Sequence, residues 1–209
     1  MKGKCFIEPL FHAVVEGRKT MMREVIKPQP KLALGYVPNV EIVLGNPDYA
    51  YKGGFRDAHG RIFVPRYIIG EKVYLKEPYY KNYPWTGNDT ASYKYERDMS
   101  IYHDGLAYMG EIEWDNPITM PSKYARYYIE ITSARVEPLQ RISGEDCEKE
   151  GICKVDNLST YKSFALPETP NYAEFKTPQK AFAALFDKIK RGTWDSNPYV
   201  WVYEFKLVK

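Results

Sequence analysis

The sequence predicts a mostly β protein with packed helices, in the α+β class. Two long segments, 125–136 and 199–208, alternate apolar and polar side chains as half-buried strands do. Helix signals are few, and short turn clusters divide most other segments, which favours a β-barrel with helices packed against it. The 209 residues suit one domain with insertions, so we expect a single domain over residues 1–209.

The N-terminal part should hold one helix followed by one strand. Proline suits a first helical turn, and apolar residues recur on one face from Pro9 to Glu16, so a short helix is expected there. Gly17 is a natural stop, because glycine takes the left-handed C-cap conformation without strain. A strand should follow over residues 21–26 and end before Pro28, since proline cannot continue a strand ladder.

Antiparallel β structure is expected over residues 36–80. Strand-like segments, divided by turn clusters such as 45–48, are 40–44, 50–56, 61–65 and 70–77. Residues 79–114 are rich in tyrosine, and disordered segments are poor in aromatic residues. We therefore expect this Tyr-rich segment to be a structured insertion.

The second half of the chain carries the clearest helix signals. The strand over 125–136 ends at a Glu-Pro pair, after which Ser143 has the spacing of an N-cap with an acidic residue at N3. This predicts a helix to about Glu150. Residues 153–176 are expected to form an irregular insertion, and a second amphipathic helix should run from Thr177 to Gly192.

Composition excludes several classes of protein. There are 30 Lys and Arg against 27 Asp and Glu, and this net charge of +3 permits nucleic acid as a partner without requiring it. No apolar run reaches the length that spans a bilayer, so no membrane association is expected. Three sparse cysteines indicate a reducing cytoplasm. Cysteine and histidine spacings fit no metal site, and glycine motifs for nucleotide cofactors are absent, so no metal or cofactor is expected.

The most informative motif is Gly17-Arg18-Lys19-Thr20 followed by Arg23. It places three cations within six residues, where a helix should turn sharply into a strand. Cations beside freed backbone N–H groups can hold a phosphate or a carbonyl oxygen. A lysine partly removed from water can also lose its proton and act as a base. The competing interpretation is a solvated turn, and the motif alone favours it.

Tyrosine next to lysine or arginine suggests a second kind of site. Residues 94–95 and 123–128 interleave these types, as single-stranded nucleic-acid sites do. Tyrosine is also an ordinary strand residue that packs across strands, and this structural interpretation is favoured.

Four blocks together resemble the phage-type members of the ASCH-domain family, in the PUA-like superfamily. They cover about two-thirds of the chain, with 79–114 and 153–176 as insertions. In order, they are Glu16–Pro28, Gly70–Glu77, Met120–Ile152 and Phe182–Phe205. The resemblance implies a PUA-like β-barrel with a cleft beside the first helix.

The resemblance also implies two kinds of function. The family has been proposed to bind RNA or nucleotides, whereas some small bacterial members resemble amidohydrolases that remove the acyl group of N4-acetylcytidine. Their working residues match Lys19 and Glu150 here, but Met22 replaces the expected threonine. Thr20 is the nearest hydroxyl and the remaining catalytic candidate, although it lies about 6–7 Å away along a strand.

Three hypotheses follow. The first is an RNA- or nucleotide-binding protein whose cleft is lined by Arg18, Lys19, Arg23 and Glu150, with Glu77 as a weaker candidate. The alternative is an amidohydrolase acting on N4-acetylcytidine-type substrates, with Lys19 as base and Glu150 as proton carrier. An ASCH-type ribonuclease rests on the breadth of the family alone. A protein-binding role for the Tyr-rich segment also stays open.

Overall fold

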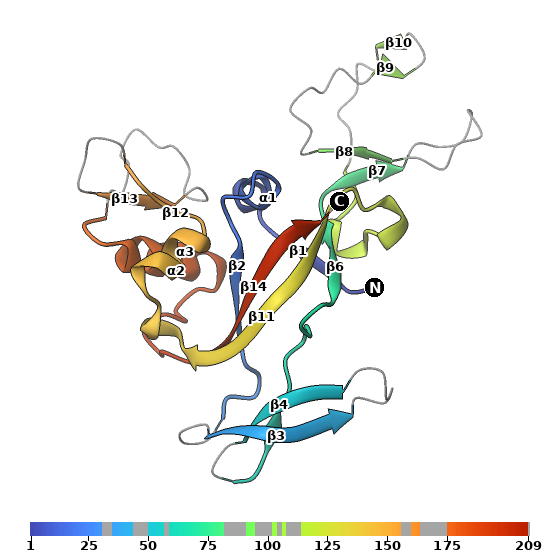
Figure 1. Cartoon of the computed structure of the whole chain (residues 1–209). Helices are drawn as coiled ribbons and strands as arrows, with labels where there is room; N and C mark the ends of the chain where they lie inside the picture. Colours follow the sequence, from blue (N-terminus) through green and yellow to red (C-terminus); the bar gives the residue numbers. More distant parts are fainter. Residues whose placement is uncertain are drawn as a thin grey trace.

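The computed structural model shows a mixed α+β protein built around one five-stranded sheet (Figure 1). The α+β class predicted from the sequence is confirmed. No helix in the described ranges is long and apolar enough to cross a bilayer. The structure describes residues 1–30, 35–43, 50–56, 59–81, 91–94, 102–103, 106–107, 114–155, 160–163 and 175–208.

The main sheet has the strand order β1-β6-β11-β14-β2. These strands are β1 (Gly3–Cys5), β6 (Lys72–Lys76), β11 (Tyr128–Pro138), β14 (Tyr199–Val208) and β2 (Met21–Val25). The β1–β6 pair is parallel and the other pairs are antiparallel. The prediction missed β1, because three residues are too few to show an alternating pattern.

Three α-helices occupy the predicted places: α1 (Glu8–Val15), α2 (Gly144–Lys149) and α3 (Pro178–Ile189). The N-cap predicted at Ser143 forms, and Thr177 caps α3 in the same way. The Ser143 hydroxyl accepts a hydrogen bond of 3.0 Å from the Asp146 N–H, and the Thr177 hydroxyl accepts one of 3.3 Å from the Lys180 N–H. Such caps satisfy N–H groups that have no partner within the helix.

Apolar side chains cover both faces of the main sheet. On one face, Met21 and Val202 pack with the apolar side of α2 and α3. On the other face, Phe11 of α1 joins Tyr203 and the fully buried Tyr67 in a second core. The helices are therefore held by burial of apolar area, the main favourable term in folding.

Smaller sheets surround this centre (Figure 1). The predicted irregular insertion in fact contains a two-stranded sheet, β12–β13, because its short strands pair with each other rather than with the main sheet. The Tyr-rich segment contributes the pairs β7–β8 and β9–β10. Its residues 82–90, 95–101, 104–105 and 108–113 lie outside the described residues, as does the turn predicted at 45–48. The strands are β3 (Gly35–Val43), β4 (Ala50–Arg56), β5 (Ile62–Phe63), β7 (Tyr79–Lys81), β8 (Ala91–Tyr93), β9 (Tyr102–His103), β10 (Leu106–Ala107), β12 (Ile152–Lys154) and β13 (Tyr161–Ser163). Single 3₁₀ turns occupy Pro117–Thr119, Ser122–Tyr124 and Leu139–Arg141.

The two edge strands of the main sheet approach each other through side chains. Lys4 of β1 forms an ion pair with Glu24 of β2, although these strands are at opposite ends of the strand order. No backbone ladder joins β1 to β2 in the part of the chain that the structure describes. The sheet is therefore open in its backbone pairing, and a side-chain contact crosses the opening.

Candidate functional site

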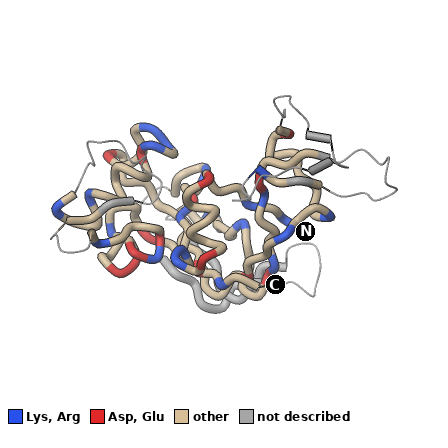
Figure 2. The backbone as a smooth tube through the Cα atoms, turned by 90° about the horizontal axis from the view of Figure 1, so that it is seen from above, with Lys and Arg blue, Asp and Glu red and all other residues tan. Residues whose placement is uncertain are grey.

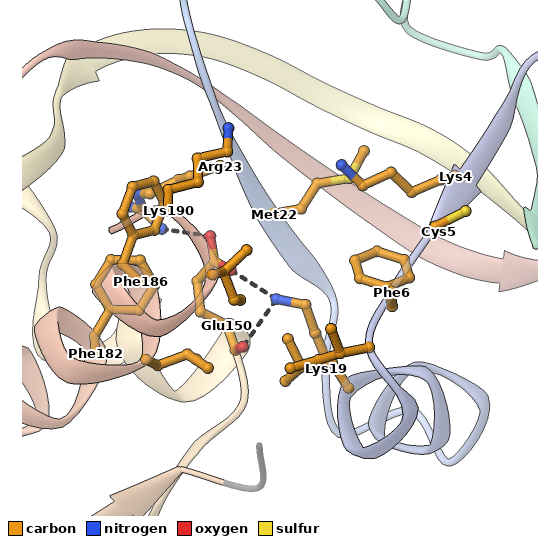
Figure 3. A pocket seen from close by; sticks show the side chains of 14 residues that line it. Lys4, Cys5, Phe6, Lys19, Met22, Arg23, Glu150, Phe182, Phe186 and Lys190 are labelled. Carbon is orange, nitrogen blue, oxygen red and sulfur yellow. Dashed lines mark hydrogen bonds and ion pairs between the residues drawn. The ribbon is translucent and has the colours of Figure 1, made fainter. Parts of the chain in front are cut away.

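A cavity of about 140 Å³ lies where the two edge strands approach each other (Figure 3). Residues from four parts of the chain line it: the segment from the end of β1 into α1, the turn before β2 with β2 itself, the residue after α2, and the last turns of α3. The lining residues are Lys4, Cys5, Phe6, Ile7, Leu10, Lys19, Met22, Arg23, Glu150, Phe182, Leu185, Phe186, Ile189 and Lys190.

The turn after α1 directs Lys19 into this cavity. Gly17 has a φ of 75°, a left-handed conformation that favours glycine. The N–H groups of Arg18 and Lys19 then both donate to the carbonyl of Ala13, at 2.8 and 2.9 Å, so the chain reverses at once. The Lys19 side chain is only 3% exposed.

Glu150 reaches the same cavity from the end of α2. Its N–H donates to the Asp146 carbonyl at 3.0 Å, and Gly151 with a φ of 100° ends the helix. A further hydrogen bond of 3.0 Å from the Thr20 N–H to the Lys149 carbonyl ties this helix end to the start of β2.

Lys19 and Glu150 form a buried hydrogen-bonded ion pair between residues 131 positions apart in sequence. The Lys19 Nζ donates to Glu150 Oε2 at 2.6 Å and to the Glu150 backbone carbonyl at 2.8 Å. Burial lowers the pKa of Lys19, because the ammonium loses its hydration, and the Glu150 carboxylate opposes this effect without cancelling it. A lysine whose pKa is lowered beside a carboxylate is suited to donate, accept or share a proton.

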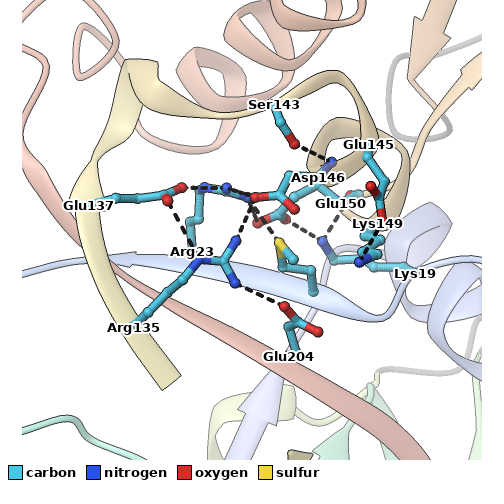
Figure 4. Close-up of polar contacts among 11 residues, drawn as sticks. Lys19, Arg23, Arg135, Glu137, Ser143, Glu145, Asp146, Lys149, Glu150 and Glu204 are labelled. Carbon is cyan, nitrogen blue, oxygen red and sulfur yellow. Dashed lines mark hydrogen bonds and ion pairs between the residues drawn. The ribbon is translucent and has the colours of Figure 1, made fainter. Parts of the chain in front are cut away.

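Arg23 holds Glu150 from the other side (Figure 4). One guanidinium nitrogen donates to Glu150 Oε1 at 3.0 Å, and the other donates to Glu137 at 2.7 Å and Asp146 at 2.9 Å. Burial by itself lowers the pKa of Arg23, but Glu150 and Glu137 outweigh it and leave that pKa above its ordinary value. Arg135 extends the network by donating to Asp146 at 2.6 Å. Arg23 therefore acts as a positioning residue for the Glu150 carboxylate.

Of the residues predicted for the site, the structure brings Lys19, Arg23 and Glu150 together. Arg18 pairs with Glu16 on the exposed side of the turn and does not line the cavity. Glu77 lies elsewhere and is fully buried against Arg126, with hydrogen bonds of 3.0 and 2.6 Å.

Met22 and Thr20, the two positions considered for a nucleophile, differ in whether they line the cavity. Met22 lines the cavity, opposite Tyr203 in the β2–β14 register. Thr20 does not line it, and its backbone carbonyl accepts from the Phe205 N–H at 2.9 Å. Among the described residues that line the cavity, none carries a hydroxyl group.

Several lining residues were not predicted from the sequence. Phe182 and Phe186 have helical spacing, which indicates a core face, and they do pack in the core while also forming a wall of the cavity. Phe6 carries no sequence signal, yet its ring centroid lies 5.7 Å from Lys19 Nζ. The Cys5 thiol also lines the cavity, and burial raises its pKa, which makes it a poor nucleophile near neutral pH.

Comparisons with protein-family models, curated proteins and solved structures found no significant match. The described residues contain no group of three or more His, Cys, Asp or Glu side chains arranged to hold a metal ion. The cavity and its buried ion pair are therefore the features of the described residues that point to a function.

Proposed function

We propose that this chain is an ASCH-type, PUA-like protein that binds the base of an RNA or a nucleotide in the cavity beside α1. The observation that carries the proposal is the Lys19–Glu150 pair, which presents a hydrogen-bond donor and an acceptor inside a cavity with aromatic walls. A buried ion pair seldom adds stability compared with well-packed apolar residues, so its position in a cavity favours a functional role.

The chemistry of the cavity suits a nucleobase. A base has apolar faces and an edge of hydrogen-bond donors and acceptors, and bases bind to proteins by contact with aromatic side chains and through that edge. Phe6, Phe182 and Phe186 supply apolar surface, while Lys19 and Glu150 supply the polar contacts. A volume of about 140 Å³ is well below that of pockets for drug-sized ligands, which favours a single ring over a whole nucleotide.

The position of the cavity supports the PUA-like barrel as the finer fold. In a closed barrel the first and last strands of the sheet lie side by side. Lys4 of β1 and Glu24 of β2 already pair across the opening, and both strands contribute to the cavity. The proposed cleft would therefore lie at the seam of the barrel.

Calorimetric titration with cytidine, uridine, adenosine and guanosine tests this function. We expect at least one nucleoside to bind, and Lys19→Met and Glu150→Gln to weaken that binding tenfold or more, because each removes a charge-assisted hydrogen bond. Glu77→Gln is the matched control, since it changes a buried carboxylate outside the cavity. Failure of all four nucleosides to bind to the folded protein would overturn the proposal.

A second candidate is hydrolysis of an N4-acylated cytidine, which the lowered pKa of Lys19 beside Glu150 favours. With Met22 in the cavity, water must be the nucleophile. Lys19 would first pass its proton to Glu150 along their hydrogen bond. Neutral Lys19 would then take a proton from the water as the new C–O bond forms, and Glu150 would give its proton to the departing amine nitrogen as the C–N bond breaks, which restores the ion pair.

Chromatography after incubation with N4-acetylcytidine tests this candidate. Conversion to cytidine and acetate should occur, and Met22→Thr should increase the rate by restoring a hydroxyl beside the base. Absence of cytidine from both reactions would exclude this activity on this substrate.

A further inference from the structure

The cations around the cavity differ in their partners. Lys19 pairs with Glu150, and Lys4 pairs with Glu24. Lys190, at the end of α3, also lines the cavity but makes no ion pair with a described residue. A half-buried lysine without a carboxylate partner is available to an anion that approaches the cavity.

A second cavity of about 410 Å³ lies next to Glu24 of the Lys4–Glu24 pair. It is lined by the end of β2, by residues 61–66 and by Trp201, and it includes Glu24 itself. Lys4 lines the first cavity and its partner Glu24 lines the second, so this ion pair links the linings of the two cavities.

Two further cations line the second cavity without an ion-pair partner among the described residues. They are Lys27, two residues after the end of β2, and Arg66, and both are exposed. Burial is the main cause of the lowered pKa of Lys190, but Lys4 and Lys27 also lower it and Glu24 raises it, so these charges are close enough to interact. Figure 2 shows that basic residues occur along the whole described backbone. Cations without an ion-pair partner near a cavity are therefore a better indication of an anion site than the overall charge is.

We infer that Lys27, Arg66 and Lys190 form a phosphate track, which runs from the first cavity past the Lys4–Glu24 pair to the second. This inference rests on the proposed function and names its ligand class: a single-stranded oligonucleotide rather than a free nucleoside. One base enters the first cavity, and the phosphates on one side of that base follow the track.

Two features select a single strand. A base in a duplex is paired and stacked, so only an unpaired base can enter a small cavity whose polar groups are buried. The second cavity combines cations with the aromatic side chains Phe63 and Trp201, and single-stranded sites combine these two residue types.

Fluorescence anisotropy with labelled single-stranded RNA hexamers, one of each base, tests the track, beside calorimetry with the four nucleosides. We expect the double variant Lys27→Gln, Arg66→Gln, which changes no residue of the first cavity, to bind the preferred hexamer at least tenfold more weakly and to keep its nucleoside affinity within twofold. The dependence of log affinity on log salt should fall by about 1.4, because each phosphate contact to a single strand contributes about 0.7. Adding Lys190→Gln should reduce the slope by a further amount of about 0.7.

Lys180→Gln is the matched control, because it removes the same charge from an exposed position ten residues, or about 15 Å, before Lys190 on α3. An equal loss of hexamer binding in the control would overturn the track in favour of a general charge effect. Competition by poly-glutamate as strong as by unlabelled RNA would also overturn it and would assign these cations to an acidic protein.

The outcomes separate the track from the proposed function. Hexamer binding that is unchanged in the double variant, together with nucleoside binding that needs Lys19, would overturn the track alone. Hexamer binding that depends on Lys27 and Arg66 but not on Lys19, without nucleoside binding, would support the track and overturn the base cavity. If neither hexamers nor nucleosides bind, both proposals fail.

Discussion

Two buried carboxylates, Glu150 and Glu77, have similar partners in different surroundings. Glu77 is fully buried and receives hydrogen bonds of 3.0 and 2.6 Å from Arg126. Glu150 is also buried, and its two oxygens are divided between Lys19 and Arg23. In both places a carboxylate removed from water is compensated by charge-assisted hydrogen bonds.

The surroundings decide what each pair can do. The Arg126 guanidinium lies 4.0 Å from the centroid of the Tyr93 ring, and the side chains around Glu77 leave it no exposed surface. Glu150 lines a cavity with Lys19, whose pKa is lowered. Burial alone therefore does not make an ion pair a candidate site. The Lys19–Glu150 pair is one because it lines a cavity and because Lys19 and Arg23 both contact the same carboxylate.

The largest expected effect comes from removing the shared carboxylate. Glu150→Ala leaves Lys19 and Arg23 in the interior without the group that both contact, so the free energy of unfolding should fall by about 3–5 kcal/mol. Urea denaturation measures it. Glu150→Gln should cost less, because the amide oxygen still accepts a hydrogen bond, and a loss below about 1 kcal/mol for alanine would contradict the buried network.

Removing the Glu77 carboxylate should have a smaller effect on stability and no effect on nucleoside binding. Glu77→Ala should lower the free energy of unfolding by about 2 kcal/mol, because the Arg126 side chain is 22% exposed and keeps its contact with Tyr93. Nucleoside affinity, measured by calorimetry on the folded variant, should stay within twofold. A large loss of affinity would break the distinction between the two pairs.

The fold was predictable wherever local pattern decides it. The strand over residues 199–208 was predicted with the bounds that β14 has, the N-cap of α2 is the expected Ser143, and α3 starts after Thr177, where the helix was expected to begin. These features depend on alternation and on cap chemistry within a few residues. In contrast, β1 exists because it pairs with β6, about 70 residues later, and nothing in three residues signals that pairing.

The site was predictable only in part. Lys19 and Glu150 were named as candidates through the family resemblance, and the structure does place them in one hydrogen-bonded pair. Arg23 was expected to contact a ligand, whereas three carboxylates that follow it by more than 100 residues occupy its guanidinium. Sequence spacing carries no information on such distant contacts, nor on which residues face a cavity.

A third prediction concerns the pH dependence that Lys19 gives to stability. Its pKa in the folded state is below the value of 10.5 for an exposed lysine. Between those two values the unfolded state binds a proton that the folded state does not, so stability rises with pH across this window. The stability of the native protein minus that of Lys19→Met should therefore increase as pH rises toward 10.5, with a slope of at most about 1.4 kcal/mol per pH unit, and stay constant below the window.

Urea denaturation of both proteins at several pH values measures this difference. Arg126→Met provides the comparison at the Glu77–Arg126 pair. An arginine stays charged throughout this pH range, so this variant should give no such slope. A difference for Lys19→Met that is flat, or that falls with rising pH, would show that Glu150 outweighs the effect of burial on the lysine.

The smallest expected effect is the energetic coupling between the N-cap of α2 and each of the two buried carboxylates. Ser143→Ala removes the N-cap of α2, the helix that ends at Glu150, and should cost about 1 kcal/mol. Combined with Glu77→Ala, its effect on the free energy of unfolding should add within about 0.5 kcal/mol, because distant sites act independently. In the double variant with Glu150→Gln, the loss in the free energy of unfolding should be smaller than the sum of the two single losses, because both substitutions loosen the same helix. If the effects add fully in both double variants, α2 does not position Glu150. Arg23 alone would then hold the Glu150 carboxylate in the cavity.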